Sequence, residues 1–103
     1  MRRNAKVDIK QPELVKQIRS LGGYVLHCHQ LKNAFDILVG YNGNLYIIEI
    51  KNDAKGKLTS GEMKCKLGFE KVGVPYYTIY NIEQFIEITK QWNTTKTNKT
   101  TMW

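Results

Sequence analysis

The pattern of hydrophobic and polar positions predicts an α/β chain with elements in the order αβββαβα. At its centre is a hairpin, because two runs rich in β-branched and aromatic residues, 35–40 and 45–51, flank the pair Asn42-Gly43. An Asn-Gly pair between two such runs is the strongest short-range signal for a hairpin with a two-residue turn. Both runs are apolar on both faces, which is typical of strands that helices cover on either side.

The segment before the hairpin predicts one helix and one strand. The helix spans residues 11–21, because Pro12 suits the first helical position and Gly22-Gly23 follows the end. The basic segment 1–10 is expected to be a solvated terminal arm, and residues 24–29 form the first strand. The apolar stripe of the helix consists of Leu14, Val15, Ile18 and Leu21.

The segment after the hairpin predicts a helix, a strand and a last helix. The first of these helices begins at Thr59 or Ser60, both good N-caps, and runs to about residue 72. A strand at 76–80 and a helix at 82–91 follow, and the low-complexity residues 92–103 predict a polar tail after a single domain, residues 1–91. In the middle helix Met63, Leu67 and Val72 are expected to face the sheet, with Cys65 or Phe69 at the flank.

A two-residue turn at Asn42-Gly43 also fixes the register of the hairpin. In that register Asp36 lies directly opposite Glu49, at a Cβ separation of about 4.5–5.5 Å, where like charges are destabilising. Lys51 is two residues beyond Glu49, so it projects from the same face of the same strand. The apolar residues expected on that face are Leu38, Leu45 and Ile47, and those expected behind it are Phe35, Ile37, Val39, Tyr46, Ile48 and Ile50.

Two acids and a lysine at one end of an apolar hairpin allow two interpretations. In the first, Lys51 forms a structural salt bridge with Asp36 or Glu49, an interaction worth little at a surface. In the second, the two carboxylates hold a hard cation, because magnesium binds through one or two carboxylates together with substrate phosphates. The residue types alone leave both interpretations open.

Three sequence blocks resemble a nuclease family. Asp36 and the run Glu49-Ile50-Lys51, on the two strands of a hairpin, resemble the D…(D/E)-x-K core of the PD-(D/E)xK nucleases. Residues 56–62, Gly-Lys-Leu-Thr-Ser-Gly-Glu, resemble the G-x-L-(S/T)-x-x-Q segment of the stand-alone VRR-NUC (virus-type replication-repair nuclease) family, many members of which are phage-encoded. Gly73-Val74-Pro75 is similar to the G-V-P strand entry of that family. The resemblance extends from about residue 7 to about residue 88.

The resemblance implies a PD-(D/E)xK nuclease-like core, in which helices flank a mixed β-sheet, and a metal-dependent DNA endonuclease activity. Asp36 and Glu49 would hold Mg²⁺ or Mn²⁺ together with the backbone carbonyl of Ile50, and such an ion activates water and stabilises charge on the scissile phosphate. Lys51 would help to position the attacking water and would stabilise charge on the phosphoryl oxygens. The catalytic residues are therefore expected to be Asp36, Glu49 and Lys51.

The same resemblance leaves two points open. The first helix is expected to add a metal ligand, for which Glu13 is the nearest match by position and Asp8 and Gln11 are alternatives. A Glu in the first turn is equally explained by the helix dipole. The chain also departs from the family pattern, with Phe35 in place of Pro and Glu62 in place of Gln. Glu62 either adds a charge beside the site or faces water.

Composition supports an intracellular protein with a polyanionic partner. The 103 residues are 42% apolar and 24% charged, which is typical of one globular domain. Because no apolar stretch approaches the ~18 residues of a membrane span and no signal peptide is evident, we expect a cytoplasmic location and no membrane partner. The net charge of +7 favours nucleic acid.

The expected partner is DNA, branched or flapped according to the resemblance, bound by a homodimer. Lys32, Lys55 and Lys57 lie on loops predicted to leave the catalytic end of the hairpin, where they can reach backbone phosphates. Cys28 and Cys65 lack metal-ligand spacing and are expected to be free thiols rather than zinc ligands. Two rival functions are a nucleic-acid-binding module that has lost catalysis and a small interaction protein without nucleic acid.

Overall fold

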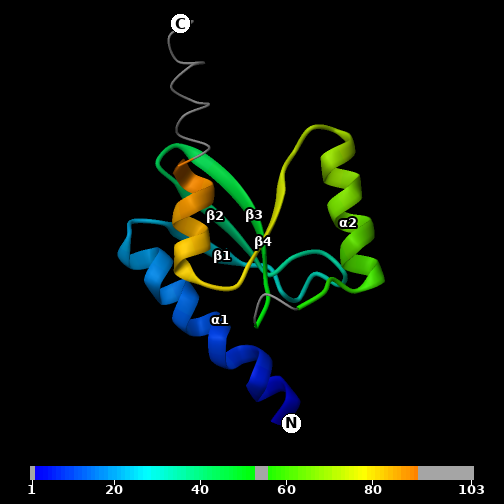
Figure 1. Cartoon of the computed structure of the whole chain (residues 1–103), viewed down its shortest axis with the longest axis horizontal. Helices are drawn as coiled ribbons and strands as arrows, with labels where there is room; N and C mark the ends of the chain where they lie inside the picture. The colour runs from blue at the N-terminus through cyan, green and yellow to red at the C-terminus, as the bar shows by residue number, and fades with distance from the viewer. Residues whose placement is uncertain (1, 53–55, 91–103) are drawn as a thin grey trace, which may run out of the picture.

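A mixed four-stranded sheet flanked by three helices forms the protein, which the computed structural model describes for residues 2–52 and 56–90 (Figure 1). The sheet order is β1-β2-β3-β4, with antiparallel pairs up to β3 and a parallel pair between β3 and β4. The predicted order αβββαβα is confirmed. The elements are α1 (Arg2–Ser20), β1 (Tyr24–His27), β2 (Ile37–Tyr41), β3 (Asn44–Ile50), α2 (Ser60–Lys71), β4 (Tyr76–Ile79) and a third helix at 82–90.

The central hairpin has the predicted turn and register. Asn42 and Gly43 both have positive φ, 53° and 83°, as a type I′ turn requires. The pairing runs from Tyr41 opposite Asn44 to Ile37 opposite Ile48. Local turn chemistry therefore fixes which side chains of β2 and β3 share a face.

Helix α1 and the third helix cover one face of the sheet, as Figure 1 shows. The predicted stripe of α1 is buried except for Leu21, which is 42% exposed. At the end of α1, a Cβ on Gly23 would lie 2.7 Å from Ile18, so the tight turn back into β1 requires glycine. The core between these layers consists of Leu14, Val15, Ile18, Val25, Ile37, Val39, Tyr46, Ile48, Ile50, Ile79 and Phe85.

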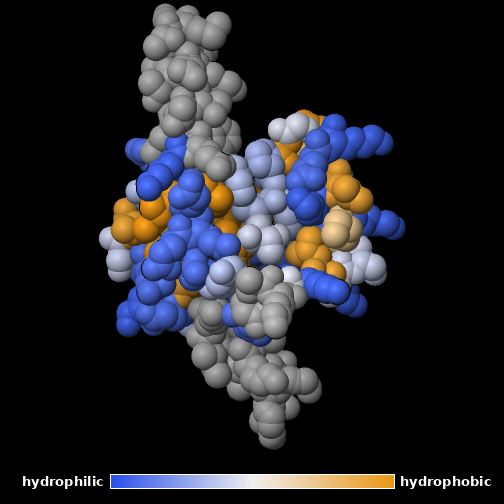
Figure 2. Space-filling model, in the orientation of Figure 1, coloured by the Kyte–Doolittle hydropathy of each residue, from blue (hydrophilic) through white to orange (hydrophobic). Residues whose placement is uncertain are grey.

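Helix α2 lies on the other side of the sheet and is turned differently from the prediction. The residues expected to face the sheet are exposed: Met63 by 42%, Leu67 by 57% and Val72 by 72%. Cys65 and Phe69 are half-buried instead, and α2 has no buried residue. Figure 2 accordingly shows hydrophobic surface over α2. Helices therefore flank both sides of the sheet as expected, but the prediction of which residues of α2 face the sheet was wrong.

Two further expectations were wrong because local patterns were extended too far. Helix α1 begins at Arg2 rather than near residue 11, so Pro12 lies inside it and the basic segment is helical. A proline removes one helical hydrogen bond and can be accommodated within a helix that continues on both sides. Phe35 contacts Phe69 of α2, with ring centroids 6.2 Å apart, because β2 begins only at Ile37 and the alternation does not extend back to residue 35.

Candidate active site

The first residue of the site is Asp36, whose side chain accepts a backbone hydrogen bond from strand β3. Its backbone carbonyl accepts from Cys28 at 2.8 Å, which continues the pairing with β1. Its N–H donates to Ile48 at 3.1 Å, and its Oδ2 accepts the N–H of Ile50 at 2.7 Å. Asp36 therefore lies one residue beyond the β2–β3 ladder, with a carboxylate oxygen fixed against β3.

Glu49 is the buried acid of the site. It is 4% exposed and lies opposite Thr78 in the parallel pair of β3 and β4. Burial, the charge of Asp36 and a hydrogen bond with Glu62 raise the pKa of Glu49 from 4.5 to about 9. Near neutral pH the metal-free site thus holds a proton on Glu49. Part of this shift is repulsion from the Asp36 carboxylate, as the hairpin register predicts.

Lys51 is the cation among these acids. Its Nζ lies 3.7 Å from Oε2 of Glu49 and 3.3 Å from Oε1 of Glu62, and it donates a 2.7 Å hydrogen bond to the carbonyl of Lys57. The side chain is 15% exposed. Lys51 therefore lies close to the acids and forms ion pairs with Glu49 and Glu62, an arrangement compatible with both interpretations of the sequence.

Glu62 joins the site rather than facing water. It is the third residue of α2 and forms a capping box with Thr59: its Oε1 accepts the Thr59 N–H at 2.9 Å, and its own N–H donates to Thr59 Oγ1 at 3.1 Å. Burial acts to raise the pKa of Glu62, but the Thr59 N–H, the hydrogen bond with Glu49 and Lys51 outweigh it and lower that pKa. The pattern Thr59-x-x-Glu62, a capping-box signature, could have placed this residue from sequence.

The donor set fits a hard divalent cation. Among the described residues, no group of three or more His, Cys, Asp or Glu side chains is arranged as a metal cluster. Magnesium needs only one or two carboxylates in addition to water and phosphate oxygens, however. Asp36 and Glu49 are such a pair, because burial raises the pKa of both and the charge of Asp36 further disfavours ionisation of Glu49. A cation would relieve the repulsion that the metal-free protein relieves with a proton.

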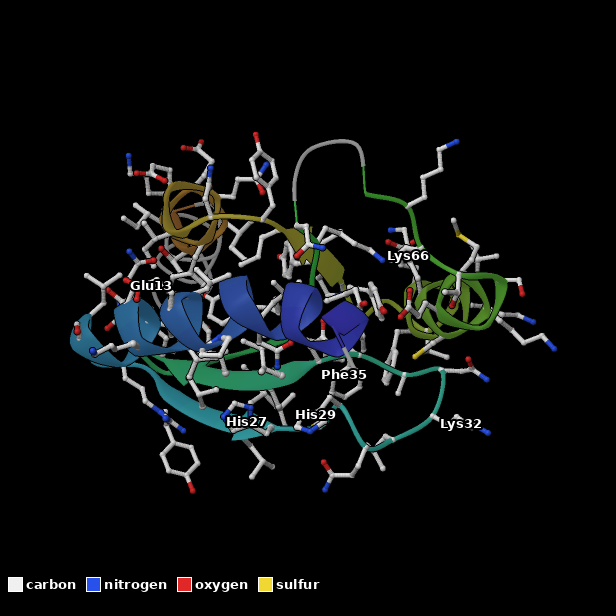
Figure 3. The ribbon with its side chains drawn as sticks, turned by 90° about the horizontal axis from the view of Figure 1, so that it is seen from below. Glu13, His27, His29, Lys32, Phe35 and Lys66 are labelled. Atoms are coloured by element: carbon white, nitrogen blue, oxygen red, sulfur yellow. The ribbon has the colours of Figure 1, made fainter. Side chains whose placement is uncertain are left out.

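Glu13 and Gln11, two of the N-terminal candidates for a further metal ligand, lie in different places in the structure. Glu13 is exposed on α1, and Figure 3 shows it well apart from Phe35, the neighbour of Asp36. The prediction that placed Glu13 at the site is not supported by this position. Gln11 is 8% exposed and lines a hollow with His29, whose neighbour Cys28 donates to the carbonyl of Asp36. The side chain of Asp8 lies outside the described residues.

The structure describes two of the three lysines that were predicted to contact phosphate. Lys32 is exposed on the loop between β1 and β2, and in Figure 3 it points away from the sheet. Lys57 is exposed and holds Lys51 through its carbonyl. Lys55 and the predicted tail lie outside the described residues. Cys28 is buried and Cys65 half-buried, and both are free thiols as predicted.

Tyr76 was missed by the sequence reasoning. It is 4% exposed on β4, and its hydroxyl donates to the carbonyl of Ala34 at 2.7 Å, which ties the loop before Asp36 to the sheet. Burial and the charges of Glu49, Cys65, Glu62 and Asp36 raise the pKa of Tyr76. Nothing in the local sequence distinguishes it from Tyr77, because its role depends on a partner 42 residues away.

One comparison with known proteins supports the fold. No protein-family model matches the chain, and no curated protein matches it significantly. A solved structure described as a VRR_NUC domain matches with a TM-score of 0.65 and 23% identity, over 82% of this chain and 95% of that one. The chain therefore has the fold of a VRR_NUC nuclease domain. No helix among the described residues is long and apolar enough to span a membrane.

Proposed function

We propose that this protein is a Mg²⁺- or Mn²⁺-dependent deoxyribonuclease that hydrolyses phosphodiester bonds in branched or flapped DNA. The observation that carries the proposal is the convergence of Asp36, Glu49 and Lys51 at one end of a sheet with the VRR_NUC fold. A buried acid pair with raised pKa is costly to the fold, and such groups are typical of functional sites. A net charge of +7 is consistent with a polyanionic substrate.

Each side chain has a role that its surroundings support. Asp36 and Glu49, with the Ile50 carbonyl between Glu49 and Lys51, would hold the cation, which when bound supplies activation of water and stabilisation of phosphate charge. The N–H of Ile50 keeps the Asp36 carboxylate in one orientation. Lys51, 3.7 Å from Glu49, would stabilise charge that develops on the phosphoryl oxygens. Glu62 accepts from Lys51 and so limits where that ammonium can lie.

Cleavage assays test the proposal directly. End-labelled flapped, branched and linear DNA of one sequence are incubated with the full chain in Mg²⁺, in Mn²⁺ or in EDTA. We expect products only with metal, more from flapped or branched DNA than from linear DNA, and none from Asp36→Asn. Asn retains an oxygen acceptor for the Ile50 N–H, so this variant should remain folded. Cleavage by Asp36→Asn at the wild-type rate would refute the metal site.

The rival function is a nucleic-acid-binding module without catalysis. It predicts metal-independent binding to the same DNA and no products under any condition. The Lys51→Ala variant separates the two in one series: for a nuclease, its cleavage rate falls far more than its affinity, because Lys51 is one phosphate contact among several. Equal losses of rate and affinity would make Lys51 an ordinary contact.

We also propose a homodimer, which the family resemblance implies, formed through α2. The exposed Met63, Leu67 and Val72 supply apolar surface of the kind that subunit interfaces bury. Sedimentation equilibrium of wild type and Leu67→Lys tests this, because a buried lysine would shift the equilibrium to monomer. An unchanged dimer would exclude this face. An intracellular location and the phage-encoded type remain expectations from the sequence.

A further inference from the structure

A hollow between α1 and β1 lies outside the acid site. It has a volume of about 390 Å³, within the ~300–1,000 Å³ range of small-molecule sites. Its lining residues are Gln11, Pro12, Val15, Arg19, His27 and His29. None of the hydrolytic roles assigned above uses the two histidines or the arginine.

The walls of this hollow combine stacking, apolar and polar groups. The rings of His27 and His29 are 5.9 Å apart at 74°, and Figure 3 shows both below α1 on the strand β1 and its continuation. Pro12 and Val15 supply an apolar wall on α1. Imidazole rings are among the surfaces on which unpaired bases stack. The hollow therefore has the chemistry of a base-binding site.

Two further groups can bind a nucleotide, Gln11 at the edge of its base and Arg19 at its phosphate. Gln11 lines the hollow and is 8% exposed. An amide can donate to and accept from the edge of a base. Arg19 donates to the carbonyl of Val25 at 3.3 Å, which holds its guanidinium at the hollow, and no acid is among the described residues that line the space.

The hollow connects to the proposed reaction centre through His29. The residue before His29, Cys28, donates its N–H to the carbonyl of Asp36 at 2.8 Å, so the end of β1 that carries this ring is hydrogen-bonded to one residue of the proposed metal pair. We propose that the hollow binds one unpaired nucleotide of the DNA substrate, its base on the histidines and its phosphate at Arg19. A base inside a duplex cannot enter, so the hollow selects DNA with a flap or unpaired end. This inference rests on the proposed function and specifies its substrate.

The histidine signals provide a direct test, because the chain has only two histidines and both line the hollow. The full-length protein is titrated in EDTA, without turnover, and the imidazole resonances are followed by NMR. Three probes share one duplex: a blunt end, a one-nucleotide flap and the same flap with an abasic nucleotide. We expect large shifts of both histidines with the natural flap only. Equal shifts with all three probes, or none, would overturn the inference.

Variants give the energetic counterpart. Replacing both histidines by Ala should weaken binding of the flap by about fivefold to tenfold, the lower part of the range for one base stacked on a ring, and leave blunt DNA unchanged. Arg19→Gln should likewise reduce the preference for the flap, whereas the charge-matched control Lys71→Gln on α2 should not. Equal effects of the two charge changes would refute the role of Arg19. Because the titrations need no cleavage, they fail or succeed independently of the nuclease assay.

Discussion

Helices α1 and α2 flank the same sheet but relate to it in opposite ways. Leu14, Val15 and Ile18 of α1 are no more than 2% exposed, whereas α2 has no buried residue. What α2 contributes is polar: through Glu62 it is joined to Lys51 and Glu49. One face of the sheet therefore carries the stability of the fold, and the other face carries a charge cluster that opposes it. Stability and chemistry should respond to different substitutions.

The largest difference between the effect on activity and the effect on stability is expected for a substitution of Glu49. Glu49→Gln should abolish cleavage and yet stabilise the metal-free protein, because it removes a buried acid next to Asp36. Since ~1 kcal/mol shifts a domain of this size by about 4–8 °C, a gain of several degrees in melting temperature is expected. Single-turnover cleavage and thermal melts in EDTA measure the two effects. Loss of stability together with activity would contradict the separation.

The gain in melting temperature of Glu49→Gln should increase with pH. The folded protein holds the proton of Glu49 up to a pKa of about 9, whereas the unfolded chain loses it near 4.5. Between these values folding takes up a proton, so the free energy of unfolding of the wild type falls as pH rises. Glu49→Gln lacks this dependence. Its advantage in melting temperature should therefore be larger at pH 8 than at pH 5.5.

A matched pair of leucines compares the two helices directly. Leu14→Ala on α1 should cost about 2–5 kcal/mol, because it leaves a cavity in the core. Leu67→Ala on α2, at a residue 57% exposed, should change stability by less than about 0.5 kcal/mol. Urea unfolding at low protein concentration, where a dimer would not contribute, measures both. Similar losses would mean that α2 is packed more tightly than the exposure of Leu67 indicates.

Salt dependence shows which side of the molecule faces DNA. Each phosphate contact contributes about 0.9 to the slope of log affinity against log salt. Replacing Lys32 and Lys57 together by Ala should flatten the slope by about two, since both lie on loops at the acid end. The control replaces Lys16 of α1 and Lys71 of α2, which are exposed elsewhere. Binding is measured in Ca²⁺ to limit turnover, and a flatter slope in the control would place the DNA elsewhere.

The smallest effect is expected at Glu62. Glu62→Gln keeps the capping box, because Gln can also accept from the Thr59 N–H, and it removes one charge beside Glu49. Stability should change by less than about 0.5 kcal/mol, and the pKa of Glu49 should fall. Glu62→Ala also loses the acceptor for the Thr59 N–H, which is one half of the capping box, and should cost up to about 1 kcal/mol. Equal melting temperatures of the Gln and Ala variants would mean that the cap contributes nothing.

The sequence predicted the features that local chemistry decides. Asn42-Gly43 determines its own turn, and alternation from that turn carries Glu49 and Lys51 to one face. The rotation of α2 could not be predicted from its apolar residues. It depends on Glu62, which is held by Lys51 at the end of β3. The start of α1 was equally hidden, since Pro12 is compatible with a first turn and with a helix interior.

The hydrogen bond from Ile50 to Asp36 has an evolutionary consequence. A descendant that lost the proposed activity would still need an acceptor at position 36, so selection on folding alone would tend to retain Asp or Asn there. Glu49 also has partners in Lys51 and Glu62, but its burial beside Asp36 is a cost to the fold that the proposed activity would offset. When homologous chains are sorted into active and degenerate copies, the residue at position 49 is therefore the more informative marker.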